Sequence, residues 1–222
     1  MQARGWFSTP ISCGALAGVC AGAVWTLMIL QVLQSPPRSV MEFFNQNALR
    51  AAVCLGVVLC APAIYHRDVL LTLKAAAWSL LNWLGSMVCG YLAWVLAARI
   101  MPGSSWEKIW RVYEVINLLT LCPILGGMTG YFLARIYGIP KLRTRAIRFG
   151  VLGCAVHLLF GLFFSVVQML GWNLDSPESL AMHTTLAILG YVFLGVATGV
   201  PFDTHFRDQA EAGKVAEGEG LH

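Results

Sequence analysis

The sequence has little charge. Aspartate, glutamate, lysine and arginine together make up 12% of its 222 residues, about half the fraction found in an ordinary soluble domain. Hydrophobic residues reach 58%, and the one extended polar stretch is the tail at 203–222. Too few polar side chains remain to cover a soluble domain, so the composition indicates a membrane protein.

Motifs of catalysis and nucleotide binding are also missing. The chain contains no Gly-x-Ser-x-Gly or His-Glu-x-x-His motif, no phosphate-binding loop and no pair of carboxylates within an apolar run. We therefore predict no catalytic residue, no cofactor and no metal site, and we favour a role other than catalysis. The net charge of +4 is small and is concentrated in one loop, which argues against nucleic-acid binding.

The polar loops hold no cysteine. All seven cysteines lie within or beside apolar runs, where a free thiol behaves as a small hydrophobic side chain. We therefore expect no disulfide bond. The cysteines are Cys13, Cys20, Cys54, Cys60, Cys89, Cys122 and Cys154.

What the chain does contain is a series of long apolar runs, which predict membrane-spanning helices. The predicted spans are about 10–34, 48–65, 75–101, 115–137, 149–172 and 182–202. The sequence thus predicts an all-α, polytopic transmembrane bundle of about six spans over residues 1–202, with no soluble domain. The polar segment 203–222 is predicted to be a mobile tail.

Positive charge indicates the orientation of these spans. An even number of spans puts both termini on one side, and the densest basic segment, 141–148, falls on that same side. Cytoplasmic loops carry an excess of lysine and arginine. We therefore predict that both termini are cytoplasmic, in a plasma membrane or a bacterial inner membrane. The basic residues that this orientation leaves outside are Arg38, Arg50, Arg99, Lys108 and Arg111.

Glycines recur every four residues in the apolar runs and so share helix faces. Such faces let two backbones approach closely, and packing with Cα–H···O contacts then supplies the attraction. We predict helix-packing contacts there, either within the bundle or with a partner subunit. The glycines are Gly14, Gly18 and Gly22 in the first run, Gly126 and Gly130 in the fourth, and Gly195 and Gly199 in the sixth.

The fourth run combines polar residues with a proline. Pro123 removes a backbone hydrogen bond, and Gly126 and Gly127 weaken the helix just beyond it. Interrupted helices of this kind line substrate cavities in transporters. We predict that Asn117, Thr120 and Pro123 lie on a substrate pathway. The alternative is an ordinary proline kink satisfied by Thr120.

Two further polar residues lie deep within apolar runs. His157 is a candidate proton carrier, metal or haem ligand, or substrate contact, or a neutral histidine that is hydrogen-bonded to a neighbouring helix. Cys154 shares its face and could contribute to a soft-metal site. Asn82 is a candidate pathway residue or a hydrogen bond between helices. His183 begins the sixth run, and we expect it at the wetted membrane surface.

Three hypotheses for function remain open. The first is a small-solute or ion transporter or channel, or the membrane subunit of one, in contact with the lipid bilayer and working as a homo-oligomer or with other membrane subunits. The second is a structural or assembly subunit that docks onto a larger membrane complex through its glycine-rich faces. The third is an intramembrane redox, haem or metal protein that uses His157.

Overall fold

The computed structural model describes residues 9–34, 39–65, 69–121, 125–169 and 176–219. Within these ranges the chain forms helices and no strand, which confirms the all-α prediction. The helices in order are α1 (Pro10–Gln34), α2 (Val40–Tyr65), α3 (Val69–Ile100), α4 (Trp106–Leu121), α5 (Gly127–Ile136), the 3-10 turn η2 (Pro140–Leu142), α6 (Arg143–Met169) and α7 (Pro177–Glu219).

Hydroxyl side chains fix the starts of three helices. Thr9 and Ser176 each precede a proline, and each accepts a hydrogen bond from the backbone N–H three residues on, at 3.2 and 3.1 Å. Ser39 does the same before α2, at 3.1 Å. A proline at the first helical position has no N–H to leave unpaired, so these sequences define helix starts locally.

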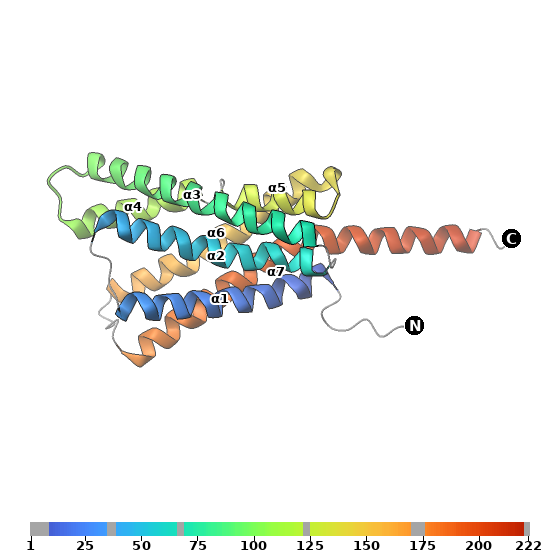
Figure 1. The fold of residues 1–222 in the computed structure, drawn as a ribbon, viewed down its shortest axis with the longest axis horizontal. Coiled ribbons are helices and arrows are strands. Elements are labelled where there is room, and N and C mark those ends of the chain that lie inside the picture. Colours follow the sequence, from blue (N-terminus) through green and yellow to red (C-terminus); the bar gives the residue numbers. More distant parts are fainter. Residues whose placement is uncertain (1–8, 35–38, 66–68, 122–124, 170–175, 220–222) are drawn as a thin grey trace.

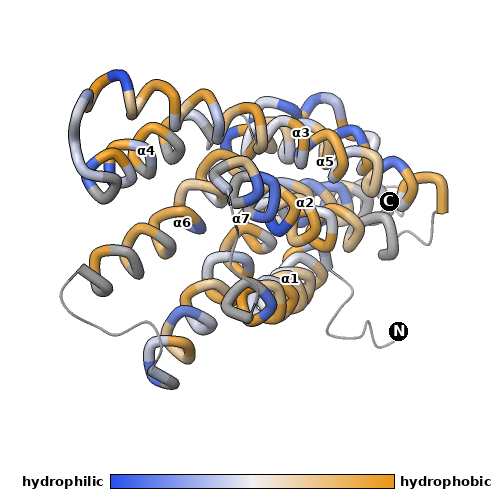
Figure 2. Tube along the Cα trace, turned by 60° about the vertical axis from the view of Figure 1, so that its left-hand side comes forward, coloured by the Kyte–Doolittle hydropathy of each residue, from blue (hydrophilic) through white to orange (hydrophobic). Residues whose placement is uncertain are grey.

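The long helices lie roughly side by side, and both ends of the chain lie at the same end of the bundle (Figure 1). Helix α7 packs against α1 and α6, α2 packs against α1 and α3, and the shorter α4 and α5 pack against α3 and α6 respectively. The first and last helices are therefore direct neighbours. Figure 2 shows that hydrophobic residues occupy most of the length of the helices.

Three helices in the described ranges are long and apolar enough to cross a membrane. They cover Pro10–Gln31, Val69–Ile100 and Glu178–Ala212, and a shorter apolar helical segment covers Ala48–Ala61. Large hydrophobic side chains point outward from α3, as expected of a surface in contact with lipid. Examples are Leu80, Leu84, Leu92 and Leu96. The structure is consistent with association with a membrane, and six spans remain a proposal.

The glycines of α1 lie directly against α7. A Cβ atom at Gly14 would overlap the backbone of Gly195, and one at Gly18 would overlap the backbone of Tyr191 and Val192. A Cβ at Gly22 would lie 2.5 Å from the Cα of Ile188. Because no side chain fits between these backbones, the two helices can approach this closely only where α1 has glycine.

Helices α5 and α6 meet in the same way. A Cβ at Gly130 would overlap the carbonyl group of Ala146, and a Cβ at Gly126 would lie 2.5 Å from the carbonyl oxygen of Gly150. Gly199 on α7 lies against Pro10 at the start of α1. Both helix pairs are thus held by backbone-to-backbone packing within this one chain.

Several element boundaries differ from the predicted ones. Helix α2 begins at Val40 and α3 at Val69, because the amphipathic turns before the apolar runs continue the helix. The predicted fourth span, 115–137, includes the end of α4 and the whole of α5, with π-helical backbone at 125–126. The segment 203–219 is helical as part of α7, since its alanine and glutamate residues favour helix once α7 has been nucleated.

Candidate functional site

Arg50 lies in the interior of the bundle. It lies on α2, about two helical turns after Glu42, and only 4% of its surface is exposed. Its Nε donates a hydrogen bond of 3.2 Å to the carbonyl oxygen of Gln46, and its Cζ lies 5.3 Å from the centre of the Trp25 ring on α1. The guanidinium group thus lies over the π face of Trp25, an arrangement that favours a cation.

Trp25 also joins α1 to α7. Its indole Nε1 donates a hydrogen bond of 3.3 Å to Nε2 of His183. An Nε2 that accepts a hydrogen bond carries no proton, so His183 in this geometry is the neutral tautomer with its proton on Nδ1. Arg50 interacts electrostatically with His183, which links all three helices through polar side chains.

Tyr191 lies at the centre of this group, with 2% of its surface exposed. Its ring centre lies 6.0 Å from that of Trp25 and 4.1 Å from that of His157 on α6. It also interacts electrostatically with Arg50. Tyr191 on α7 therefore contacts a ring from α1 and a ring from α6, and it interacts electrostatically with a side chain from α2.

His157 fits beside α7 because of a glycine. A Cβ at Gly190 would lie 2.6 Å from Nδ1 of His157, so any larger residue there would displace the imidazole. This Nδ1 is buried and has no hydrogen-bond partner within the described residues. A buried ring nitrogen without a partner carries a desolvation cost, and a ligand or water that bonds to it would remove that cost.

Two thiols complete the group, which we call the α7 cluster: Trp25, Arg50, Cys54, Cys154, His157, His183 and Tyr191. Cys54 donates a hydrogen bond of 3.3 Å to the carbonyl oxygen of Ala21. Cys154 is buried in the same core as Cys54 and Tyr191. In the part of the chain that the structure describes, no three histidine, cysteine or acidic residues are placed to hold a metal ion together.

The α7 cluster presents one permanent cation, two imidazoles and a phenol in an apolar surrounding. Arginine donors recognise carboxylates and other oxyanions through paired hydrogen bonds, and tyrosine and histidine add single donors. An ionic contact is stronger here than in water because the effective dielectric constant is low. The arrangement is chemically suited to bind a small anionic or carboxylate-bearing solute.

Sequence reasoning found only part of this cluster. It singled out His157 and Cys154, but it expected His183 at the wetted surface and counted Arg50 among the basic residues on the non-cytoplasmic side of the membrane. The signal for Arg50 was present, because Ala and Leu precede it and Ala-Ala-Val follows it inside an apolar run. A charge there must face protein.

The other predicted pathway residues lie elsewhere. Asn82 is on α3 with 1% of its surface exposed, and neither atom of its amide group has a hydrogen-bond partner among the described residues. Thr120 on α4 donates a hydrogen bond of 2.9 Å to the carbonyl oxygen of Ile116. The side chain of Asn117 and the whole of Pro123 lie outside the described residues. Asn82 and Thr120 are not part of the α7 cluster.

No family model, curated protein or solved structure matches the chain.

Proposed function

We propose that the chain is a six-span membrane protein that binds a small anionic or carboxylate-bearing solute at the α7 cluster and carries it across the membrane. Helices α1, α3 and α7 contain the three candidate spans, and α2 contributes the apolar segment Ala48–Ala61. Helix α6 has 27 residues, which corresponds to a length of about 40 Å. The pair α4 and α5 would supply the remaining crossing.

Arg50 carries the proposal. A charged side chain within a membrane bundle is costly, and such residues mark substrate or ion pathways. Arg50 is almost fully buried and lies within reach of Trp25, His183 and Tyr191.

Irregular backbone and a buried polar group beside α5 support a pathway rather than a solid bundle. The backbone at 125–126 is π-helical, just before α5 begins at Gly127. Thr129 on α5 is fully buried, and its hydroxyl has no partner within the described residues. Interrupted membrane helices with unsatisfied polar groups border the cavities of transporters.

The glycine faces argue against the assembly alternative in its simplest form. The faces of Gly14, Gly18 and Gly22 contact α7, and Gly126 and Gly130 contact α6. These surfaces are already used within the chain, so a partner subunit or a second copy would have to bind another surface. The proposed orientation places both termini and the basic segment 141–148 in the cytoplasm of a plasma or bacterial inner membrane.

Flux measurements on proteoliposomes test the proposal. We would record currents and tracer uptake for chloride, phosphate, acetate and citrate, and compare the parent chain with Arg50→Ala, Arg50→Lys and the control Arg99→Ala, whose charge is exposed at the end of α3. We expect a saturable signal for at least one anion, retained by Arg99→Ala and lost in Arg50→Ala.

Folding must be separated from function in this test. Arg50→Lys keeps the charge, so we expect it to fold and to bind the same anion more weakly, because lysine lacks the planar donor pair. The absence of a saturable signal for every anion in folded parent protein would overturn the proposal. An equal signal in parent and folded Arg50 variants would do the same.

A further inference from the structure

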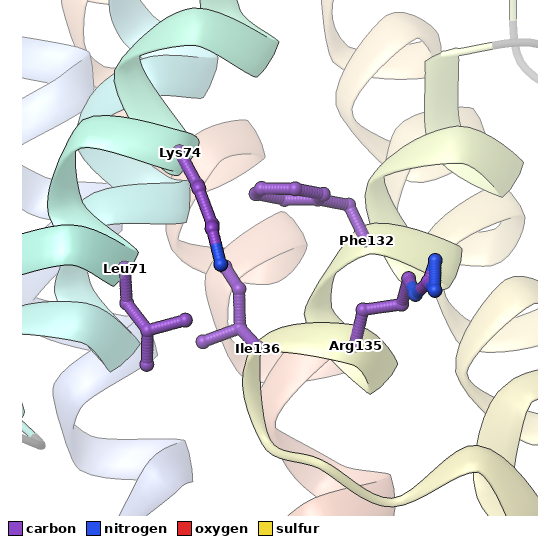
Figure 3. Close-up of a pocket in the computed structure, with 5 residues that line it drawn as sticks. All are labelled: Leu71, Lys74, Phe132, Arg135 and Ile136. Carbon is purple, nitrogen blue, oxygen red and sulfur yellow. The ribbon is translucent and has the colours of Figure 1, made fainter.

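A cavity of about 350 Å³ lies between α3 and α5, and none of its lining residues belongs to the α7 cluster. Its lining residues are Leu71 and Lys74 from α3, and Phe132, Arg135 and Ile136 from α5. Figure 3 shows Lys74 extending from α3 toward α5, with the Phe132 ring beside it and Ile136 below it. The volume is about that of a dozen water molecules.

The cavity combines two cations with an apolar wall. Lys74 and Arg135 are both exposed, so the cavity opens to the surface. Neither forms an ion pair with an acidic residue in the part of the chain that the structure describes. The remaining lining side chains are hydrocarbon. A ligand that fits this lining must carry negative charge at one end and apolar groups at the other.

A stacked pair of rings joins the two helices beside the cavity. Trp78 on α3 and Phe132 on α5 stack with ring centres 4.8 Å apart and planes within 3° of parallel. Trp78 lies one helical turn after Lys74, and Phe132 is itself a lining residue of the cavity. The two helices that line the cavity are therefore in direct aromatic contact next to it.

The position along the helices matches the headgroup layer of a bilayer. Lys74 lies five residues after the start of α3, about 7.5 Å along its axis. Arg135 is the penultimate residue of α5. The same end of the bundle holds Arg143, whose guanidinium lies 4.8 Å from the ring centre of Tyr131, and Arg145, which lies 6.0 Å from that of Phe149. Cations beside aromatic rings are typical of the membrane interface.

From these observations we propose that the cavity between α3 and α5 binds an anionic phospholipid of the surrounding membrane. Lys74 and Arg135 hold its phosphate, and Leu71, Phe132 and Ile136 contact the glycerol and the first part of an acyl chain. Basic pockets between membrane helices bind acidic headgroups in this way. A soluble phosphate would satisfy the two cations but would leave the apolar wall without a partner.

Lipid retention measured by native mass spectrometry tests this site. The full chain is reconstituted in phosphatidylcholine nanodiscs that contain a minority of phosphatidylglycerol, then released into detergent, and the bound lipids are counted. We expect phosphatidylglycerol to be retained in preference to phosphatidylcholine. The double variant Lys74→Ala/Arg135→Ala should bind it about 30-fold more weakly.

Two controls distinguish the cavity from a generally basic surface. Lys141→Ala/Arg207→Ala removes the same charge from exposed positions and should retain the lipid. Leu71→Trp keeps both cations but places a larger ring in the part of the cavity that the acyl chain would occupy, so it should weaken lipid retention. Thermal unfolding in pure phosphatidylcholine checks that each variant folds, and Lys74→Gln/Arg135→Gln replaces the alanine pair if that pair does not.

Three results would overturn the proposal. One is equal retention of the two lipids by the parent chain. Another is full retention in Leu71→Trp, which would assign the attraction to surface charge alone. The third comes from adding inorganic phosphate or glycerol 3-phosphate to protein in pure phosphatidylcholine: binding as tight as that of the lipid would make a soluble phosphate the ligand.

Discussion

Trp25 makes two polar contacts, each through a different part of its own side chain. Its π face lies beneath Arg50, and its N–H group donates to His183. The ring thereby fixes an arginine from α2 and a histidine from α7 relative to α1. At the scale of single residues, the orientation of this one ring connects three helices of the α7 cluster.

Replacing Trp25 by phenylalanine keeps an aromatic face for Arg50 and removes the donor to His183. We expect the free energy of unfolding to fall by about 0.5–1.5 kcal/mol, and the anion affinity of the cluster to fall with it. Trp83→Phe is the matched control, because it removes an exposed indole hydrogen bond of 3.1 Å to Asn45. Thermal unfolding in detergent compares the stability of the two variants. An equal loss of stability in Trp25→Phe and Trp83→Phe would contradict the prediction.

Adding a single methyl group at Gly18 should destabilise the protein. The Cβ atom would overlap the backbone of α7, and overpacking of this kind costs about 1–3 kcal/mol. Gly85 on α3 provides the control, since nothing lies within 4 Å of a Cβ there. Gly85→Ala should be neutral or stabilising because alanine favours helix.

Thermal unfolding of these two alanine variants tests whether the glycine face of α1 contributes to the stability of the bundle. A folded Gly18→Ala with the stability of the parent would show that α1 and α7 do not approach as closely as the structure has them. Gly18→Leu extends the series, and we expect it to fold poorly.

The sequence could predict features that depend on one helix, but not those that depend on which helices meet. Glycine spacing depends only on helix geometry, so the sequence could indicate faces built from Gly14, Gly18 and Gly22. The position of His157 inside an apolar run was equally visible. The environment of Arg50 was not, because it depends on Trp25, His183 and Tyr191 from other helices, and no local pattern states which helices meet.

At the scale of elements, α7 differs most from its predicted form. The sequence predicts a span to residue 202 and a mobile polar tail, whereas α7 runs without a break from Pro177 to Glu219. Pro201 lies inside this helix and is buried. Phe202 stacks on Tyr137 with ring centres 4.3 Å apart, and Phe206 contacts the edge of the same ring. The aromatic contacts past the proline hold α7 against the end of α5.

Two variants compare how much the packed part of α7 and its exposed end contribute to stability. A chain that ends at Gln209 keeps Phe202 and Phe206, and residues 207–211 are exposed, so we expect the unfolding temperature of the parent. Phe202→Ala should instead cost about 3–5 kcal/mol, because a fully buried phenylalanine leaves a cavity. Calorimetry in one detergent compares the unfolding temperatures of the two variants. A large fall in the unfolding temperature of the shortened chain would show that residues beyond Gln209 also stabilise the bundle.

At the scale of the whole molecule, the arrangement of the ends makes the proposed topology testable. Both termini lie at the same end of the bundle (Figure 1). We expect reporter fusions at Lys141 and at the C-terminus to show the same side of the membrane. A fusion in the turn at Gly103, between α3 and α4, should show the opposite side. Fusions at Lys141 and the C-terminus that report opposite sides would exclude six spans.

The contact between α1 and α7 has a consequence for biosynthesis. Helix α1 is made before α7, but its glycine face meets residues 188–195, which are made about 170 residues later, or roughly 10–30 s at ordinary rates of translation. Until then the glycine face of α1 and Arg50 lack the α7 side of their surroundings. The contact between α1 and α7 therefore forms only after the other helices of this bundle have been made, and a chain stalled before α7 leaves Arg50 without part of its surroundings.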